Sequence, residues 1–436
     1  MLALFEKYGR PVARFIIKCN KWDWLIMLPF ILLSLKVRLQ YFFFLRSPGQ
    51  SFPKAADSEW YLRYAHALLA GKPIGGHMDD ILYMGYNFLL ALLLAIGKQP
   101  VAVLFLQSVT AGLAVILVYQ ISRMLFNRTT AIIASYLYCY YTWPITLWSV
   151  YILSDSFFIT LLLLCVYFLI KALDSGRRTF QILFVVTACY VLIFRPTGIL
   201  VIGCVVIYLL INANRKRLVE WLHRYRWVLG GAAATVLIAL VYGWATGKLD
   251  PFMESLRFNA KMVLYNIYAK GWIYDRATPS DHSYKPDYEI DVMDSLIVSF
   301  LVNNWNDIAV LYAKRTAAFL GTWVWRTDLT TLHGMVQFAK NMLPTGLFLL
   351  GVVAAVRNGL FRKASILLWI VIAVFLFCIL LFIDGMYRYK APSTPFILIM
   401  AAYGIERIVH GVLQLARAGL ALWVQFRKRN DASYSA

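Results

Sequence analysis

Charged residues are scarce in this sequence. Only 15% of the 436 residues are charged, whereas 61% are hydrophobic, and the mean hydropathy is +0.65. A soluble chain of this length needs far more polar surface, so the composition excludes a soluble globular protein and indicates a polytopic membrane protein. The apolar runs are continuous rather than alternating, which favours spans made of α-helices.

Cysteines and several diagnostic motifs are also rare or absent. The chain has six cysteines; five fall inside apolar runs, and Cys19 precedes the first run. The sequence therefore predicts neither a disulfide framework nor a cysteine-based metal site. It contains no Walker loop and no HExxH motif. It shows no internal repeat and no inverted pair of broken helices, which counts against a secondary transporter.

Basic residues outnumber acidic ones by 43 to 22, which gives a net charge of +21. Most of them sit in short clusters between apolar runs, as expected for cytoplasmic loops rather than for a nucleic-acid surface. Several basic residues precede the first apolar run, and no small-residue cleavage pattern follows it. We therefore expect an uncleaved first span with the N-terminus in the cytoplasm.

The apolar runs and basic clusters together predict an all-α polytopic membrane protein of about ten transmembrane helices, with both termini in the cytoplasm. The predicted spans are 24–45, 101–122, 130–148, 151–173, 180–194, 197–211, 227–245, 338–356, 364–383 and 391–409. The apolar run 86–96 has about eleven residues where a span needs roughly twenty. We expect it to lie flat in the outer interface, because a crossing there would place every later basic cluster outside.

Two segments are too long for plain connections, and both are predicted to lie outside the cell. Residues 46–100 form the first and carry an amphipathic helix at 57–70. Residues 246–337 form the second, which is polar at first and then amphipathic. Residues 1–410 thus make up the membrane domain, and the basic tail 411–436 suits a helix on the cytoplasmic surface.

Six short motifs follow one another between residues 20 and 410. They are Asp57-Ser58-Glu59-Trp60-Tyr61, Met84-Gly85-Tyr86, Ile121-Ser122-Arg123-Met124-Leu125-Phe126, Leu153-Ser154-Asp155, Phe194-Arg195-Pro196-Thr197 and Arg388-Tyr389-Lys390-Ala391-Pro392. In this order they resemble the motifs of bacterial membrane glycosyltransferases related to the protein O-mannosyltransferases and the lipid A aminoarabinose transferase. The prolines that usually precede Gly85 in that family are missing here. The resemblance implies a GT-C type enzyme that uses a polyprenyl-phosphate sugar on the outer face of the membrane.

Transfer from a lipid phosphate sugar needs a base for the acceptor hydroxyl and cations for the departing phosphate. The resemblance places the catalytic aspartate at Asp57, although an aspartate there could instead cap the helix that follows it. Glu59, Tyr61, Tyr86 and Asp155 are the candidate substrate-binding residues. Of these, Glu59 could equally be a solvated helix residue, and Asp155 could be another helix cap.

Five basic residues are candidates for holding the donor phosphate. Arg388 and Lys390 follow a span at the external surface, where a guanidinium fork suits a phosphate; the alternative is an ordinary interfacial anchor. Arg195 is a further candidate, and its alternative is a plain charge at a turn. Lys36 and Arg38, inside the first span, would either line a site for an anionic lipid head or snorkel to the outer headgroups.

A divalent metal is compatible with the sequence, but the spacing of potential ligands defines no site. The candidate groups are His77, Asp79 and Asp80 with Asp57, and His282 with Asp281 and Asp287. Hydrated loop residues explain both groups as well, so we assign no cofactor.

The sequence thus predicts an enzyme of the bacterial inner membrane that transfers a hexose or pentose from a polyprenyl-phosphate donor. The acceptor is a glycan, a lipid or a protein, and the partners besides these are membrane lipids, with no nucleic acid. Two alternatives stay open: a transporter or flippase of a lipid-linked glycan, and an oligosaccharide ligase with a polyprenyl-diphosphate donor. A transporter should bury charge at mid-membrane, and a diphosphate donor should demand more cations.

Overall fold

The computed structural model describes residues 23–72, 81–140, 143–213, 215–273, 277, 281–321, 329–381 and 386–433. Within these ranges every regular element is helical and no strand occurs, which confirms the predicted all-α fold.

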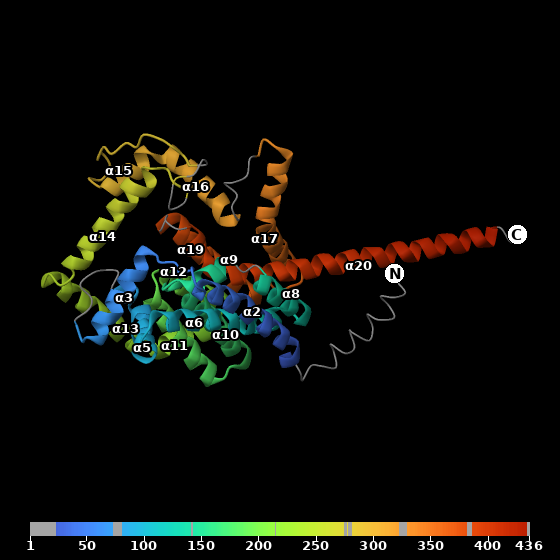
Figure 1. Ribbon diagram of the computed structural model, residues 1–436, viewed down its shortest axis with the longest axis horizontal. Coiled ribbons are helices and arrows are strands. Elements are labelled where there is room, and N and C mark those ends of the chain that lie inside the picture. The colour runs from blue at the N-terminus through green and yellow to red at the C-terminus, as the bar shows by residue number, and fades with distance from the viewer. Residues whose placement is uncertain are drawn as a thin grey trace.

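The first half of the chain consists of short and long helices (Figure 1). They are α2 (Asp23–Arg46), α3 (Ala56–Leu69), α5 (Met84–Gly97), α6 (Pro100–Leu113), α7 (Val115–Leu125), α8 (Arg128–Tyr140), α9 (Trp143–Thr146), a 3-10 turn (Leu147–Val150) and α10 (Asp155–Ser175).

The second half begins with a pair of short apolar helices and ends with the longest helix of the chain. Its helices are α11 (Arg178–Phe194), α12 (Thr197–Asn212), α13 (Arg215–Ala245), α14 (Asp250–Met262) with a π-helical extension (Val263–Tyr268), α15 (Leu296–Asn303), α16 (Trp305–Leu320), α17 (Leu332–Arg357), α18 (Phe361–Leu376) with a π-helical extension (Phe377–Leu381), α19 (Met386–Lys390), a 3-10 turn (Ala391–Ser393) and α20 (Thr394–Ser433).

Six segments among the described residues are long and apolar enough to cross a membrane, so the chain is an integral membrane protein. They are Asp23–Arg46, Pro100–Leu125, Asp155–Ser175, Leu332–Arg357, Phe361–Ile379 and Arg388–Leu420. Helices α15 and α16, which meet at 82°, would make a seventh if the bent pair counts as one span.

The predicted number of ten spans is therefore not confirmed. The predicted spans 180–194 and 197–211 are helices of 17 and 16 residues, shorter than the usual span. The predicted span 130–148 contains α8, which ends after 13 residues. Helix α13 begins twelve residues before the predicted span 227–245, inside the basic segment, because 31 residues form one continuous helix there.

The first predicted external segment contains the helices that the sequence indicated. Helix α3 covers the amphipathic stretch predicted at 57–70, and Gly71 follows it with a φ of +67°, a conformation that glycine adopts without strain. Helix α5 has 14 residues, or about 21 Å, too short to cross a membrane upright. Both helices pack against each other beside α6.

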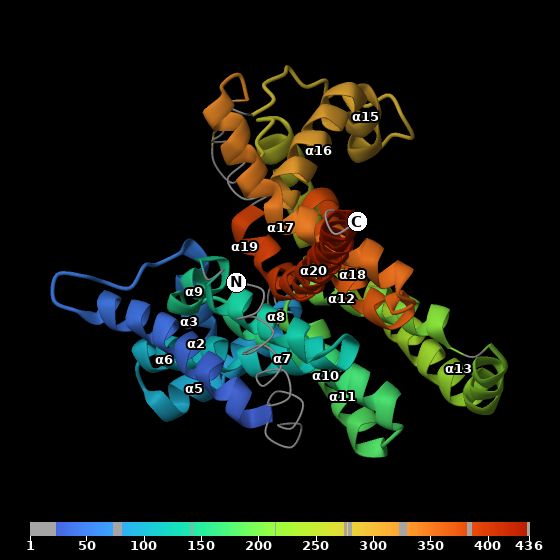
Figure 2. The same ribbon diagram turned by 90° about the vertical axis from the view of Figure 1, so that its right-hand side faces the viewer.

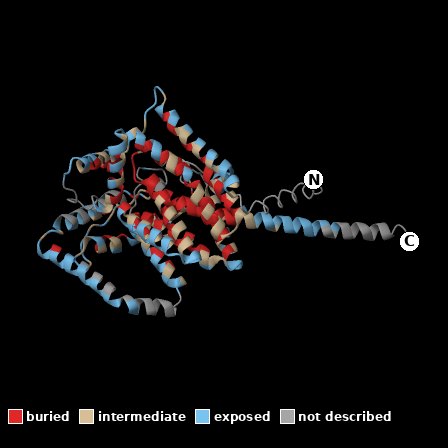
Figure 3. Cartoon of the chain, turned by 90° about the horizontal axis from the view of Figure 1, so that it is seen from below, coloured by how far each residue is buried: buried red, intermediate tan, exposed pale blue. Residues whose placement is uncertain are grey.

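Helix α10 lies at the centre of the bundle, with 67% of its most apolar window buried, against 17% for α2 and 22% for α17. Figure 3 shows the buried residues gathered in the middle of the bundle. Helices α15 and α16 lie side by side on one side of the bundle in both views (Figures 1 and 2). Helix α20 continues without a break past the bundle, so the described part of the predicted tail 411–436 prolongs the last span.

Candidate active site

Asp57 lies in the first turn of α3, but it is not the residue that caps the helix. The cap position is Ala55, whose backbone N–H donates to the Ser58 hydroxyl at 3.3 Å. The structure therefore removes the capping role that the sequence left open for Asp57. Its side chain is 45% exposed and lies near the N-terminal end of the helix.

Arg388 joins Asp57 to Asp155. Its Nη1 donates to Asp57 Oδ2 at 2.5 Å, and its Nε donates to Asp155 Oδ2 at 2.8 Å. The remaining oxygen of Asp155 accepts a hydrogen bond from Arg195 Nη1. Two carboxylates and two guanidinium groups thus form one continuous, electrically neutral chain, which we call the charged quartet. The fold brings together Asp57 and Arg388, which are 331 residues apart in the sequence.

Local structure explains the positions of Asp155 and Arg195, the inner members of the quartet. Asp155 is the first residue of α10, and the residue at the cap position, Ser154, makes no capping hydrogen bond. Both Asp155 oxygens bond to arginines, so the capping role that the sequence allowed for it is excluded as well. Arg195 separates α11 from α12 with an extended backbone, because the proline that follows it disfavours a helical conformation.

Burial rises along the quartet from Asp57 to Arg195. The side chain of Arg388 is 13% exposed, and those of Asp155 and Arg195 are fully buried. Buried charges are tolerated only when they are paired, and here the inner pair satisfies that condition. The outer pair, Asp57 and Arg388, is the more exposed part of the quartet.

Three guanidinium nitrogens of the quartet have no hydrogen-bond acceptor among the described residues. They are Nη2 of Arg388 and both Nε and Nη2 of Arg195. Because a buried donor without an acceptor costs about 1–3 kcal/mol, such groups mark positions where a ligand or water completes the site. The quartet therefore offers donors for an additional anionic oxygen beside Arg388.

Aromatic rings enclose the quartet. Tyr61 and Tyr86 are buried, and their rings meet edge to face with centroids 4.8 Å apart. The Tyr389 ring lies 4.7 Å from the Arg195 guanidinium carbon and 5.5 Å from that of Arg388. Burial raises the pKa of Tyr61 and of Tyr83, so both hydroxyls stay protonated at neutral pH. The sequence does not indicate a site role for Tyr83 or for Tyr389.

Gly85 allows α5 to approach the end of α11. A Cβ atom at this position would lie 3.0 Å from the carbonyl oxygen of Ile193 and 3.1 Å from the Cα atom of Phe194. The hydroxyl of Tyr190 also donates to the carbonyl of Gly85 at 2.9 Å. This contact places Tyr86 beside the turn that carries Arg195.

The other predicted site residues form no ion pair with the quartet within the described part of the chain. Lys390 donates to the carbonyl of Gly321 at 2.6 Å and thereby fixes the end of α16 to the start of the last span. Arg38 is fully buried within the bundle and donates to the carbonyls of Ser34 and Tyr138, at 3.2 and 3.0 Å. Lys36 and Glu59 are exposed and form no ion pair within the described part of the chain.

No metal site emerges from the residues that the structure describes. They contain no group of three or more potential ligands among His, Cys, Asp and Glu. His282 Nε2 instead lies 2.8 Å from Asp307 Oδ1, and Asp281 accepts from the backbone of Ile273. Of the other candidate group, His77, Asp79 and Asp80 lie outside the described residues.

Comparison with known proteins agrees with this picture. Residues 84–244 match the family model for dolichyl-phosphate-mannose-protein mannosyltransferase, a segment that contains Tyr86, Asp155 and Arg195. The structure is similar to that of the oligosaccharyltransferase AglB from Archaeoglobus fulgidus, solved in complex with an inhibitory peptide and a dolichol-phosphate, with a TM-score of 0.51 and 13% sequence identity. No curated protein matches the chain in sequence.

The alignment with AglB covers 95% of this chain and 52% of AglB, so the chain spans about half the length of that protein. At this identity the likeness concerns the fold. Together with the family match it supports a membrane glycosyltransferase of the GT-C type, and it confirms the resemblance drawn from the sequence.

Proposed function

We propose that the protein transfers one sugar from a polyprenyl-monophosphate donor to a hydroxyl group of a glycan, lipid or protein, at the external face of the bacterial inner membrane. The observation that carries the proposal is the position of Arg388 between Asp57, which is half exposed, and Asp155, which is buried. The helix with Asp57 begins in the loop after the first span, where a lipid donor and a water-borne acceptor can both arrive.

In the proposed reaction Asp57 takes the proton of the acceptor hydroxyl. The acceptor oxygen forms a bond to the anomeric carbon of the sugar while the bond from that carbon to the phosphate oxygen breaks. The polyprenyl phosphate leaves with the electron pair, and Arg388 stabilises the negative charge that grows on it. Asp155 and Arg195 keep the guanidinium of Arg388 in place.

Charge balance favours a monophosphate donor. The quartet is neutral while Asp57 is paired with Arg388. When Asp57 turns towards an acceptor hydroxyl, the other three members of the quartet carry a net charge of one positive unit. A sugar phosphodiester carries one negative charge and compensates it. A diphosphate donor carries more charge and would require further cations near Arg388. The dolichol-phosphate in the AglB structure is a lipid of the proposed class.

An oligosaccharide ligase is the second candidate, because AglB is an oligosaccharyltransferase and its structure contains a peptide. The two candidates differ in the leaving group, which is a lipid monophosphate in our proposal and a lipid diphosphate in a ligase.

A matched donor panel tests the proposal. Purified protein in nanodiscs receives hexoses and pentoses attached to the same polyprenol through either a monophosphate or a diphosphate, and the released polyprenyl lipid is measured by mass spectrometry. We expect at least one monophosphate donor to release polyprenyl monophosphate, with Asp57→Asn as the inactive control. Turnover restricted to diphosphate donors would contradict the proposal and favour the ligase.

A further inference from the structure

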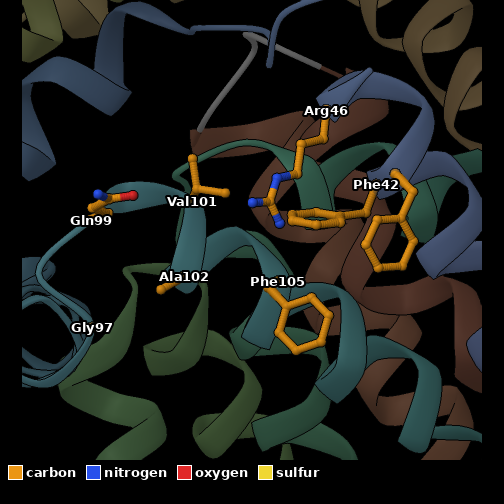
Figure 4. Close-up of a pocket in the computed structure, with 8 residues that line it drawn as sticks. Phe42, Arg46, Gly97, Gln99, Val101, Ala102 and Phe105 are labelled. Atoms are coloured by element: carbon orange, nitrogen blue, oxygen red, sulfur yellow. The ribbon is translucent and has the colours of Figure 1, made fainter. Parts of the chain in front are cut away.

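A second potential binding site lies on the other side of α6 from the charged quartet. It is an open pocket of about 360 Å³ lined by Phe42, Phe43, Arg46, Gly97, Gln99, Val101, Ala102 and Phe105. These residues belong to the end of α2, to the corner between α5 and α6, and to the first turns of α6 (Figure 4).

Helix α6 separates this pocket from the quartet. Phe105 lines the pocket, whereas Gln107, two residues later, donates to the carbonyl of Tyr151, and its own carbonyl accepts from Ser156. Ser156 follows Asp155 directly. Residues two positions apart point to nearly opposite sides of a helix, so the pocket is a separate site.

The pocket combines an apolar wall with one unpaired cation. Phe43 and Phe105 are largely exposed, and Phe42 packs against Phe105 with ring centroids 5.5 Å apart. Figure 4 shows the Arg46 guanidinium turned inwards beside Val101. Arg46 makes no ion pair or hydrogen bond with its side chain within the described residues.

The position of Arg46 relative to a bilayer follows from the length of α2. Its 24 residues extend over about 36 Å, enough to cross a hydrocarbon core of about 30 Å. Arg46 is its last residue and therefore lies at the level of the lipid headgroups. A cation at that depth, above exposed phenylalanines, matches an amphiphile with an anionic head and an apolar chain.

We propose that this pocket binds one anionic phospholipid of the surrounding bilayer, with its phosphate on Arg46 and one acyl chain over Phe43 and Phe105. Phe42 contacts Phe52 at 5.1 Å between ring centroids, and Phe52 lies in the loop that leads to Asp57. The bound lipid thus stabilises the loop that precedes Asp57. The conformational order of this loop then depends on the lipid composition of the bilayer. This site is independent of the reaction proposed above.

Retention of lipid by the purified protein tests the site. The protein is released from nanodiscs of phosphatidylcholine with phosphatidylglycerol, and bound lipids are counted by native mass spectrometry. We expect the wild type to retain one phosphatidylglycerol more than Arg46→Ala. Val101→Trp, which fills the pocket and keeps the cation, should lose the same lipid, whereas Lys72→Ala, at an exposed cation outside the pocket, should retain it.

Hydrogen exchange supplies the second measurement. Phosphatidylglycerol should slow amide exchange over residues 47–55 in the wild type and not in Arg46→Ala. Equal retention by the wild type and Arg46→Ala would overturn the proposal, as would equal retention of phosphatidylcholine. Displacement of the phosphatidylglycerol by polyprenyl monophosphate, or by millimolar inorganic phosphate, would overturn it in favour of those ligands.

Discussion

At the scale of single residues, Arg388 is the side chain that connects Asp57, the proposed base, to the buried Asp155. It donates to two carboxylates and still has one nitrogen without an acceptor among the described residues. A guanidinium can serve two fixed partners and a third one because its donors lie in one rigid plane, which a lysine cannot reproduce. This property explains why an arginine occupies the position.

Replacing Arg388 should weaken donor binding. We expect Arg388→Ala to lose about 2–5 kcal/mol of affinity for polyprenyl monophosphate, the usual effect of removing one partner of a buried charge pair. Arg388→Lys should fall between this variant and the wild type. The fold should survive, because Asp155 keeps its pairing with Arg195. A binding titration in nanodiscs measures the affinity, and an unchanged value in Arg388→Ala would remove Arg388 from the donor site.

Tyr389 is a positioning residue, since its ring lies against both Arg195 and Arg388. Each cation–π contact is worth about 0.5–2 kcal/mol. Tyr389→Leu should therefore lower kcat by roughly 3- to 30-fold with a smaller change in KM, and Tyr389→Phe, which keeps the ring, should restore most of the rate. If the leucine and phenylalanine variants were equally slow, the hydroxyl rather than the ring would carry the role.

At the scale of elements, the contact between α5 and α11 sets the geometry of the site. Gly85→Ala should destabilise the protein by about 1–3 kcal/mol, the common cost of overpacking, because its Cβ meets backbone atoms that cannot turn away. The same shift should displace Tyr86 and Arg195 and lower turnover.

Gly203→Ala is the matched control for this substitution. Gly203 lies in α12, and a Cβ there meets nothing within 4 Å. An alanine in a helix interior is favoured over glycine by about 0.5–1 kcal/mol, so melting temperature should stay equal or rise. Equal melting temperatures and rates for both variants would show that the close approach at Gly85 is unimportant.

Several elements could be predicted from the sequence because their signals are local. The aromatic spacing predicted both ends of α3 to within one residue. The short apolar run predicted α5 as a helix too short to span the membrane. Pro196 predicts the break between α11 and α12. Helix α8 was predicted too long, since the apolar pattern continues beyond Tyr140 into short turns.

The pairing within the site could not be predicted, although the sequence nominated Asp57, Asp155, Arg195 and Arg388 one by one. Their contacts span 40 to 331 residues, and nothing in a single sequence records which distant charges meet. For the same reason the sequence could not show that Arg38 donates to the carbonyl of Tyr138, 100 residues away.

At the scale of the whole molecule, the orientation in the membrane rests on the basic clusters. We expect a cysteine at Lys98 or at Ser283 to be labelled by an impermeant reagent from outside, and a cysteine at Asn214 to stay unlabelled. The background needs Cys189 replaced, because it is exposed, while four other cysteines are buried. External labelling at position 214 would contradict the predicted topology.

The number of ten spans stays a prediction, because a continuous apolar sequence does not by itself imply a crossing. Helices α11 and α12 are apolar along their length, yet each has fewer than the roughly twenty residues that a span requires. They pack against each other as a hairpin beside α10 and α18. Composition therefore predicted the class of protein. The length of each helix depends on where the chain turns within the bundle, which composition does not predict.

The central claim concerns Asp57, and the variant Asp57→Asn tests it most directly. Asparagine is nearly isosteric and removes only the charge. If Asp57 is the base, the variant should fold, melt near the wild-type temperature and bind polyprenyl monophosphate, but lose about 10²–10⁴-fold in the rate of sugar transfer. Transfer at the wild-type rate by the folded Asp57→Asn protein would contradict the account.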